Sequence, residues 1–188
     1  MDVKEILLSY LRGSREGLLW KVEGLSEREL RLPRTITGTN LLGVVKHCAY
    51  VEHGYVITCF GRTSPLEIPD LDYDADPNAD FYATAEESAE EIIALYRQVG
   101  AVVDRAIEDL PLDTPGHVAW WGERGDTTLG RVLVHVLTDV TRHAGHADTL
   151  REGIDGVAGL MAGNTNLWEP GDGWAAHVER LTLLADGA

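Results

Sequence analysis

The chain has 188 residues, is 44% hydrophobic and carries a formal net charge of −15 at pH 7. A chain of this length can bury a sizeable core without disulfides or a structural metal, so we expect one domain over residues 1–188. Nucleic-acid affinity depends on Lys and Arg that neutralise phosphates, and the sequence has no basic cluster. The composition therefore argues against nucleic acid and against a polybasic membrane contact as partners.

Helical periodicity dominates the chain in sequence order, and no strand pattern or internal repeat competes with it. The expected helices lie at about 3–23, in a short piece between Ser26 and Pro33, and at about 40–60, 84–110, 127–152 and 175–184. The first has no continuous apolar run typical of a signal peptide, and no segment has the roughly 20 apolar residues that cross a bilayer. We therefore expect a cytoplasmic protein.

The ends of these helices and the loops between them complete the fold prediction. The helix at 84–110 is expected to begin at Thr84, because T-A-E-E offers a capping box with Glu87. A long loop with three prolines and five aspartates covers residues 63–80, and a second connection covers 112–126. The pattern predicts an all-α fold, namely a four-helix bundle with long inter-helix loops and a short C-terminal helix.

The last long helix contains polar residues that solvent exposure does not explain. In the segment TDVTRHAGHADTLRE, a helical projection places His143 within the apolar arc and Asp139 and His146 at its polar edge. Burial of any of them without a partner is costly. They are therefore expected to form either a hydrogen-bonded cluster or a metal site.

The helix at 40–60 supplies a histidine of matching orientation. His47 projects toward the apolar side of LLGVVKHCAYVEHGY, whereas His53 projects outward. A core-facing His on one helix and an Asp/His pair at i, i+4 on another are typical of metal sites inside helix bundles. Two imidazoles and a carboxylate suit zinc or another borderline divalent metal, and three protein ligands leave one position open. His135 and His146 stay alternatives, because each lies within two turns of Asp139.

Three segments resemble the DinB-like superfamily of metal-dependent four-helix-bundle proteins. They are VAWWGERGD, TLGRVLVHVLTDVTRHAGHADTLREGIDG and LLGVVKHCAYVEHGY. In that superfamily, one ligand comes from a His on the second helix and two come from an i, i+4 pair on the last. The resemblance implies His47, Asp139 and His143 as ligands. Asp139 departs from the His or Glu usual at its position and is shorter, so His135 is an alternative ligand.

The resemblance also implies a function. Characterised members include isomerases and S-transferases that use mycothiol, bacillithiol or glutathione. A metal-dependent thiol enzyme is therefore expected, in which a divalent ion (zinc, with nickel, iron or manganese as alternatives) binds a low-molecular-weight thiolate that attacks a small electrophile. His146 is expected to relay a proton or to orient Asp139. The alternative is a non-catalytic stress-response bundle that binds a metal or ligand.

Two further expectations concern the surroundings of the site. His117, Trp120 and Trp121 lie on the loop that enters the last long helix, where they are predicted to line a pocket. The alternative is that the tryptophans close the end of the bundle. A homodimer is expected from the resemblance.

Overall fold

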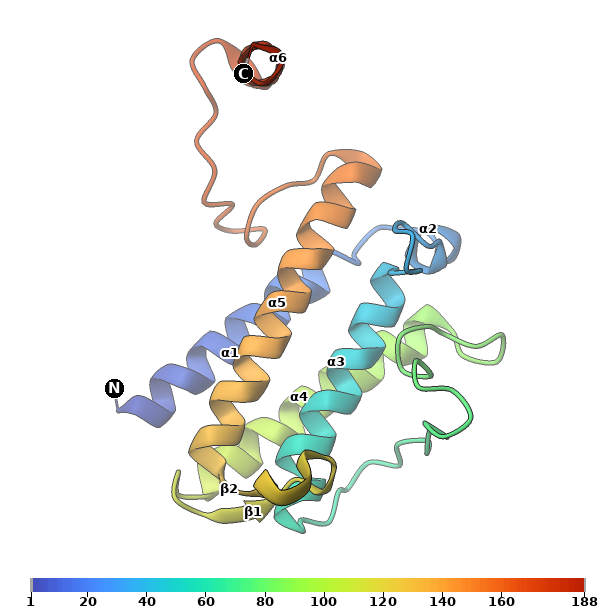
Figure 1. Cartoon of the computed structure of the whole chain (residues 1–188), viewed down its shortest axis with the longest axis vertical. Coiled ribbons are helices and arrows are strands. Elements are labelled where there is room, and N and C mark those ends of the chain that lie inside the picture. The colour runs from blue at the N-terminus through green and yellow to red at the C-terminus, as the bar shows by residue number, and fades with distance from the viewer. Residues whose placement is uncertain (1, 188) are drawn as a thin grey trace. The chain divides into compact units, whose positions relative to one another are not determined.

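The computed structural model describes residues 2–187 and is mostly helical, which confirms the predicted helical class. The elements are α1 (Val3–Trp20), α2 (Glu27–Arg31), α3 (Leu41–Val56), η1 (Thr58–Phe60), α4 (Ala89–Asp109), β1 (Pro115–His117), η2 (Ala119–Arg124), β2 (Asp126–Thr128), α5 (Leu129–Asp155) and α6 (Gly173–Asp186). Figure 1 labels the α-helices and the two strands. Internal contacts divide the chain into two units, 1–158 and 159–188. The single domain over the whole chain stays a prediction.

Four long helices build the core of the first unit. α1 packs against α4 and α5, and α3 packs against the same two helices, as Figure 1 shows. All four contribute fully buried apolar side chains, among them Leu11, Val45, Val103 and Val136. No helix within residues 2–187 is long and apolar enough to cross a membrane.

α4 begins five residues later than predicted. Its N-cap is Ser88, whose side chain accepts from the backbone of Glu91 in a capping box. At the predicted start, Glu87 accepts from the backbone N–H of Thr84 at 2.7 Å, but it also accepts from Lys46 Nζ at 2.8 Å. The predicted start at Thr84 is wrong, because Thr84 to Glu87 forms a separate turn that is bonded to α3.

Two short strands were not predicted. β1 and β2 pair antiparallel, with Pro115 opposite Thr128 and His117 opposite Asp126. They enclose the 3₁₀ segment η2, which carries both Trp120 and Trp121, at the entry to α5 (Figure 1). The prediction of a connection without strands is therefore wrong. The pairing of β1 with β2 fixes η2, with its two tryptophans, to the first turn of α5.

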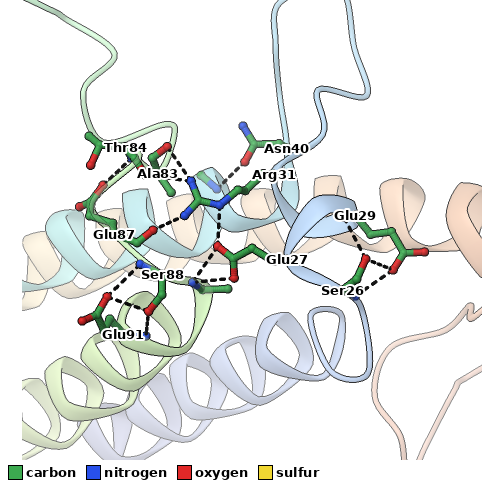
Figure 2. A network of polar contacts seen from close by, with 12 residues as sticks. Ser26, Glu27, Glu29, Arg31, Asn40, Ala83, Thr84, Glu87, Ser88 and Glu91 are labelled. Atoms are coloured by element: carbon green, nitrogen blue, oxygen red, sulfur yellow. Dashed lines mark hydrogen bonds and ion pairs between the residues drawn. The ribbon is translucent and has the colours of Figure 1, made fainter.

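α2 anchors the segment that precedes α4. As Figure 2 shows, the Arg31 guanidinium donates to the carbonyls of Ala83 and Thr84 at 3.0 and 2.9 Å. Its Nε donates to Glu27 at 2.6 Å, and Glu27 in turn accepts from the backbone N–H of Ala89 at 3.1 Å. One cation thus orders the backbone that enters α4.

Gly43 on α3 allows this segment to cross the helix at close range. A Cβ at this position would overlap the backbone carbonyl of Phe81, which also accepts from Asn40 Nδ2 at 3.2 Å. Gly43→Ala is therefore expected to push Phe81 and its neighbour Asp80 away from α3 and to destabilise the fold by about 1–3 kcal/mol. Urea denaturation measures this change.

The matched control is Gly13→Ala on α1, where an added Cβ meets nothing within 4 Å. This change is expected to leave stability unaltered or to raise it by about 0.4–1 kcal/mol, because alanine has the smaller entropy loss on folding. Equal effects of the two substitutions would show that the close approach at Gly43 is unimportant.

Candidate metal centre

α3 and α5 bring three potential ligands together. Nε2 of His47 lies 3.6 Å from Oδ2 of Asp139, and Nε2 of His143 lies 3.8 Å from Oδ1 of the same aspartate. One ligand atom from each residue falls within 4.8 Å of the others. Tetrahedral zinc with bonds of about 2.1 Å separates its ligands by about 3.4 Å. The three side chains therefore need only small shifts to share one ion.

The chemistry of the donors fits a divalent cation. Asp139 Oδ2 is buried and has no hydrogen-bond partner among the described residues. Buried polar atoms in folded proteins almost always have partners, so such unsatisfied atoms need an explanation. A set of two imidazoles and one carboxylate is the donor set that zinc and similar metals prefer.

Asp80 binds the ring nitrogen of His47 that does not face Asp139. Oδ2 of Asp80 lies 2.8 Å from Nδ1 of His47, and the aspartate is only 5% exposed. The Phe81 ring stacks on the imidazole with centroids 3.9 Å apart and planes 18° from parallel. Because the carboxylate accepts from Nδ1–H, the lone pair of His47 is placed on Nε2, which faces Asp139. This is the carboxylate–histidine pair that commonly supports a metal ligand.

The sequence reasoning missed Asp80. It is the last of five aspartates in the loop 63–80, and no periodicity distinguishes it from the other four. Its position depends on contacts distant in sequence, namely those of the segment 81–88 with α2 and α3. Nothing in the sequence signals this contact.

The protonation states agree with a ligand role. Burial, and after it the neighbouring charge of His47, lowers the pKa of His143 to about 4, so this imidazole is neutral at pH 7. Burial opposes the charged form of Asp139, but the two histidines outweigh it and lower the pKa of the aspartate. Burial lowers the pKa of His47, but Asp139 and Asp80 raise it. The two aspartates outweigh burial, so the pKa of His47 is raised overall. A bound cation would displace any proton on His47.

Asp80→Ala is expected to weaken metal binding by roughly 10- to 100-fold, which is typical of losing the partner that orients a ligating histidine. The reason is that His47 would keep its ring but lose the bond that sets its tautomer. Competition with a chromogenic chelator measures the affinity. Asp74→Ala removes an exposed carboxylate from the same loop and is expected to leave the affinity unchanged. Equal affinities of the two variants would exclude a supporting role for Asp80.

His135 and His146 lie outside the triad. Both are exposed, although they occupy the same helix. The ring of His135 contacts Tyr55 and Trp121, with centroids 4.8 and 5.1 Å apart. The ring of His146 meets that of His143 edge-on at 5.4 Å. Their proposed roles, as alternative ligand and proton relay, stay predictions.

Tyr55 ties the two predicted pocket tryptophans together. Its hydroxyl accepts from Nε1 of Trp120 at 2.9 Å and from Nε1 of Trp121 at 3.1 Å. Trp120 lines two cavities, and Trp121 lines one of them. His117 is exposed, bonds Asp126 through Nδ1 at 2.8 Å and does not line either cavity.

The larger of these cavities opens beside the triad. Its volume is about 640 Å³. The lining residues are mainly apolar and aromatic and include His47, Tyr50, Tyr55, Ile68, Tyr73, Asp80 and Trp120. His53, expected to point outward, is half-buried and lines the same cavity. A space of this size and composition accommodates a small organic molecule next to the candidate ligands.

The fold and the site define the class of this protein: it is mostly helical and carries a His–Asp–His cluster between two helices. The chain matches the mycothiol S-transferase family over residues 6–156, from α1 to the end of α5, and it belongs to that family. This membership confirms the resemblance to the DinB-like superfamily. Comparison with curated proteins gave no match.

Proposed function

We propose that the protein is a metal-dependent enzyme of low-molecular-weight thiol chemistry, an S-transferase or isomerase that uses mycothiol or a related thiol. The observation that carries the proposal is the convergence of His47, Asp139 and His143 from two helices, with Asp80 behind His47. Membership of the mycothiol S-transferase family supports it. In this proposal α1, α3, α4 and α5 form the four-helix bundle of the superfamily.

His47, Asp139 and His143 would hold a divalent ion, for which zinc is the first candidate and nickel, iron and manganese are the others. Such an ion supplies a positive charge that lowers the pKa of a thiol and so favours the nucleophilic thiolate. Asp139 contributes the negative charge of the site, and Asp80 orients His47. In this proposal His146 would pass the thiol proton to solvent, and its exposure and its ring contact with His143 support that role.

The second substrate in this proposal is a small electrophile in the 640 Å³ cavity. The aromatic walls formed by Tyr50, Tyr55 and Trp120 exclude water from an organic molecule bound beside His47. In a transfer reaction, a sulfur–carbon bond forms, the bond from that carbon to the leaving group breaks, and the thiol proton leaves to solvent. The expected homodimer stays a prediction.

The test is a thiol-transfer assay with zinc-loaded protein, mycothiol and monochlorobimane, followed by fluorescence of the thioether product. Bacillithiol and glutathione are the alternative thiols. We expect turnover with at least one of them that stops on chelation and is absent from His143→Ala. A protein that binds stoichiometric metal but turns over none of the thiols with any electrophile, and isomerises no substrate, would instead be a non-catalytic metal-binding protein.

A further inference from the structure

We propose that a second cavity, next to the metal centre, binds the carboxylate of a small organic anion. It has a volume of about 570 Å³ and is lined by Trp120, Trp121, Arg124, Arg131, His135 and Thr138, together with Val134. The identity of the molecule that carries the carboxylate rests on the proposed thiol chemistry. Binding of the anion does not, and it is tested separately.

The charge of this cavity is opposite to that of the whole chain. The chain has a net charge of −15, yet two arginines and no carboxylate lie among the described residues that line the cavity. Arg124 and Arg131 form no ion pair with any residue between 2 and 187. In a chain with 31 acidic residues, two arginines without an acidic partner in one cavity leave their charge available to a ligand.

The guanidinium of Arg131 lies over the ring of Trp121. Its guanidinium carbon lies 4.8 Å from the centroid of the Trp121 ring. A guanidinium that rests on an aromatic ring uses its face for that contact and keeps its N–H groups free for bidentate bonding to a planar oxyanion. The arginine is therefore supported by the protein but not neutralised by it.

The supporting ring is itself fixed. Trp121 donates through Nε1 to Tyr55 Oη at 3.1 Å, and its ring meets the ring of His135 edge-on at 5.1 Å. Tyr55 is only 9% exposed, so the indole is tied to a buried residue of α3. Such support reduces the ordering that a ligand has to impose on the cavity when it binds.

Two lining residues of this cavity lie about one turn or less from Asp139 along α5. His135 and Thr138 precede Asp139 on α5 by four residues and by one, which corresponds to a rise of about 6 Å or less along the helix. Trp120 lines both this cavity and the larger one beside His47. A carboxylate on Arg131 would thus anchor a molecule whose other end reaches the triad. The electrophile can carry it, and so can glutathione or bacillithiol, whereas mycothiol has no carboxylate.

Benzoate is the probe that tests the site, because it combines a carboxylate with a flat ring that suits the indole walls. Chelator-treated protein is titrated with benzoate by calorimetry, which makes the result independent of metal. We expect saturable binding, about 10- to 100-fold weaker in Arg131→Gln, since this change removes a charge-assisted hydrogen-bond donor. Arg105→Gln removes the same charge from an exposed position on α4 and is expected to bind benzoate as the parent does.

Two outcomes would overturn the inference: no benzoate binding by a parent that binds metal, or equal binding by Arg131→Gln and Arg105→Gln. Binding of the uncharged analogue benzamide as tightly as benzoate would overturn it as well. Failure of the metal site with intact benzoate binding would refute the proposed function alone. With metal-loaded protein, competition between benzoate and glutathione or bacillithiol, which both have carboxylates, assigns the site to the thiol, whereas simultaneous binding assigns it to the electrophile.

Discussion

Replacing His143 with alanine is expected to lower zinc affinity by more than about 100-fold, beyond the loss typical of an outer partner of a ligand. The reason is that His143 is one of three candidate donors found among residues 2–187, and its imidazole is neutral at pH 7 because its pKa is lowered to about 4. Its removal leaves no unpaired charge in the protein, so the helices should keep their packing. Competition with a chromogenic chelator gives the affinity.

The control for this variant is His117→Ala, which removes an exposed imidazole outside the triad. It is expected to bind zinc with the affinity of the parent. Circular dichroism of both variants should show unchanged helix content. A folded His143→Ala variant with parental zinc affinity would show that this side chain is not a ligand.

Glu52→Gln is expected to destabilise the fold by about 3 kcal/mol, because breaking a buried ion pair leaves a charge without compensation. The Glu52 side chain is fully buried and accepts from Arg15 Nε at 2.7 Å and from Tyr96 Oη at 3.0 Å. Arg15 also pairs with Asp104, and this contact limits the loss. The ion pair joins α1, α3 and α4, so urea denaturation monitored by circular dichroism measures its contribution to the whole fold.

The matched control is Glu108→Gln. Glu108 pairs with Arg12 at 2.6 Å, but its side chain is 52% exposed. Such surface pairs contribute about 0–1 kcal/mol, so this variant should unfold nearly as the parent does. A loss below about 1 kcal/mol for Glu52→Gln would mean that the buried pair is offset by its desolvation.

The long helices could be predicted from the sequence because periodicity over 16 or more residues is a strong local signal. The two strands could not, since each has three residues and no alternation can be read over that length. The start of α4 was misplaced because T-A-E-E and S-A-E-E follow one another. The two motifs are distinguished only by the contact of Glu87 with Lys46 on another helix, which makes the first motif a turn outside α4.

The same division applies to the candidate site. Helical projection oriented His47, Asp139 and His143, and the family resemblance selected them among the other histidines. The structure brings these three together. The position of Asp80 behind His47 and that of Arg131 over Trp121 depend on loop conformations and on contacts between distant elements. Neither could be read from spacing along one helix.

The central claim is that α3 and α5 share one metal ion. Elemental analysis of untagged protein, beside His47→Ala and His143→Ala, tests it most directly. We expect close to one divalent metal per chain in the parent and loss of that metal in both variants, since each removes a ligand from a different helix. A parent that binds no metal after incubation with zinc, nickel, iron and manganese would contradict the claim, and the triad would then be a buried polar cluster.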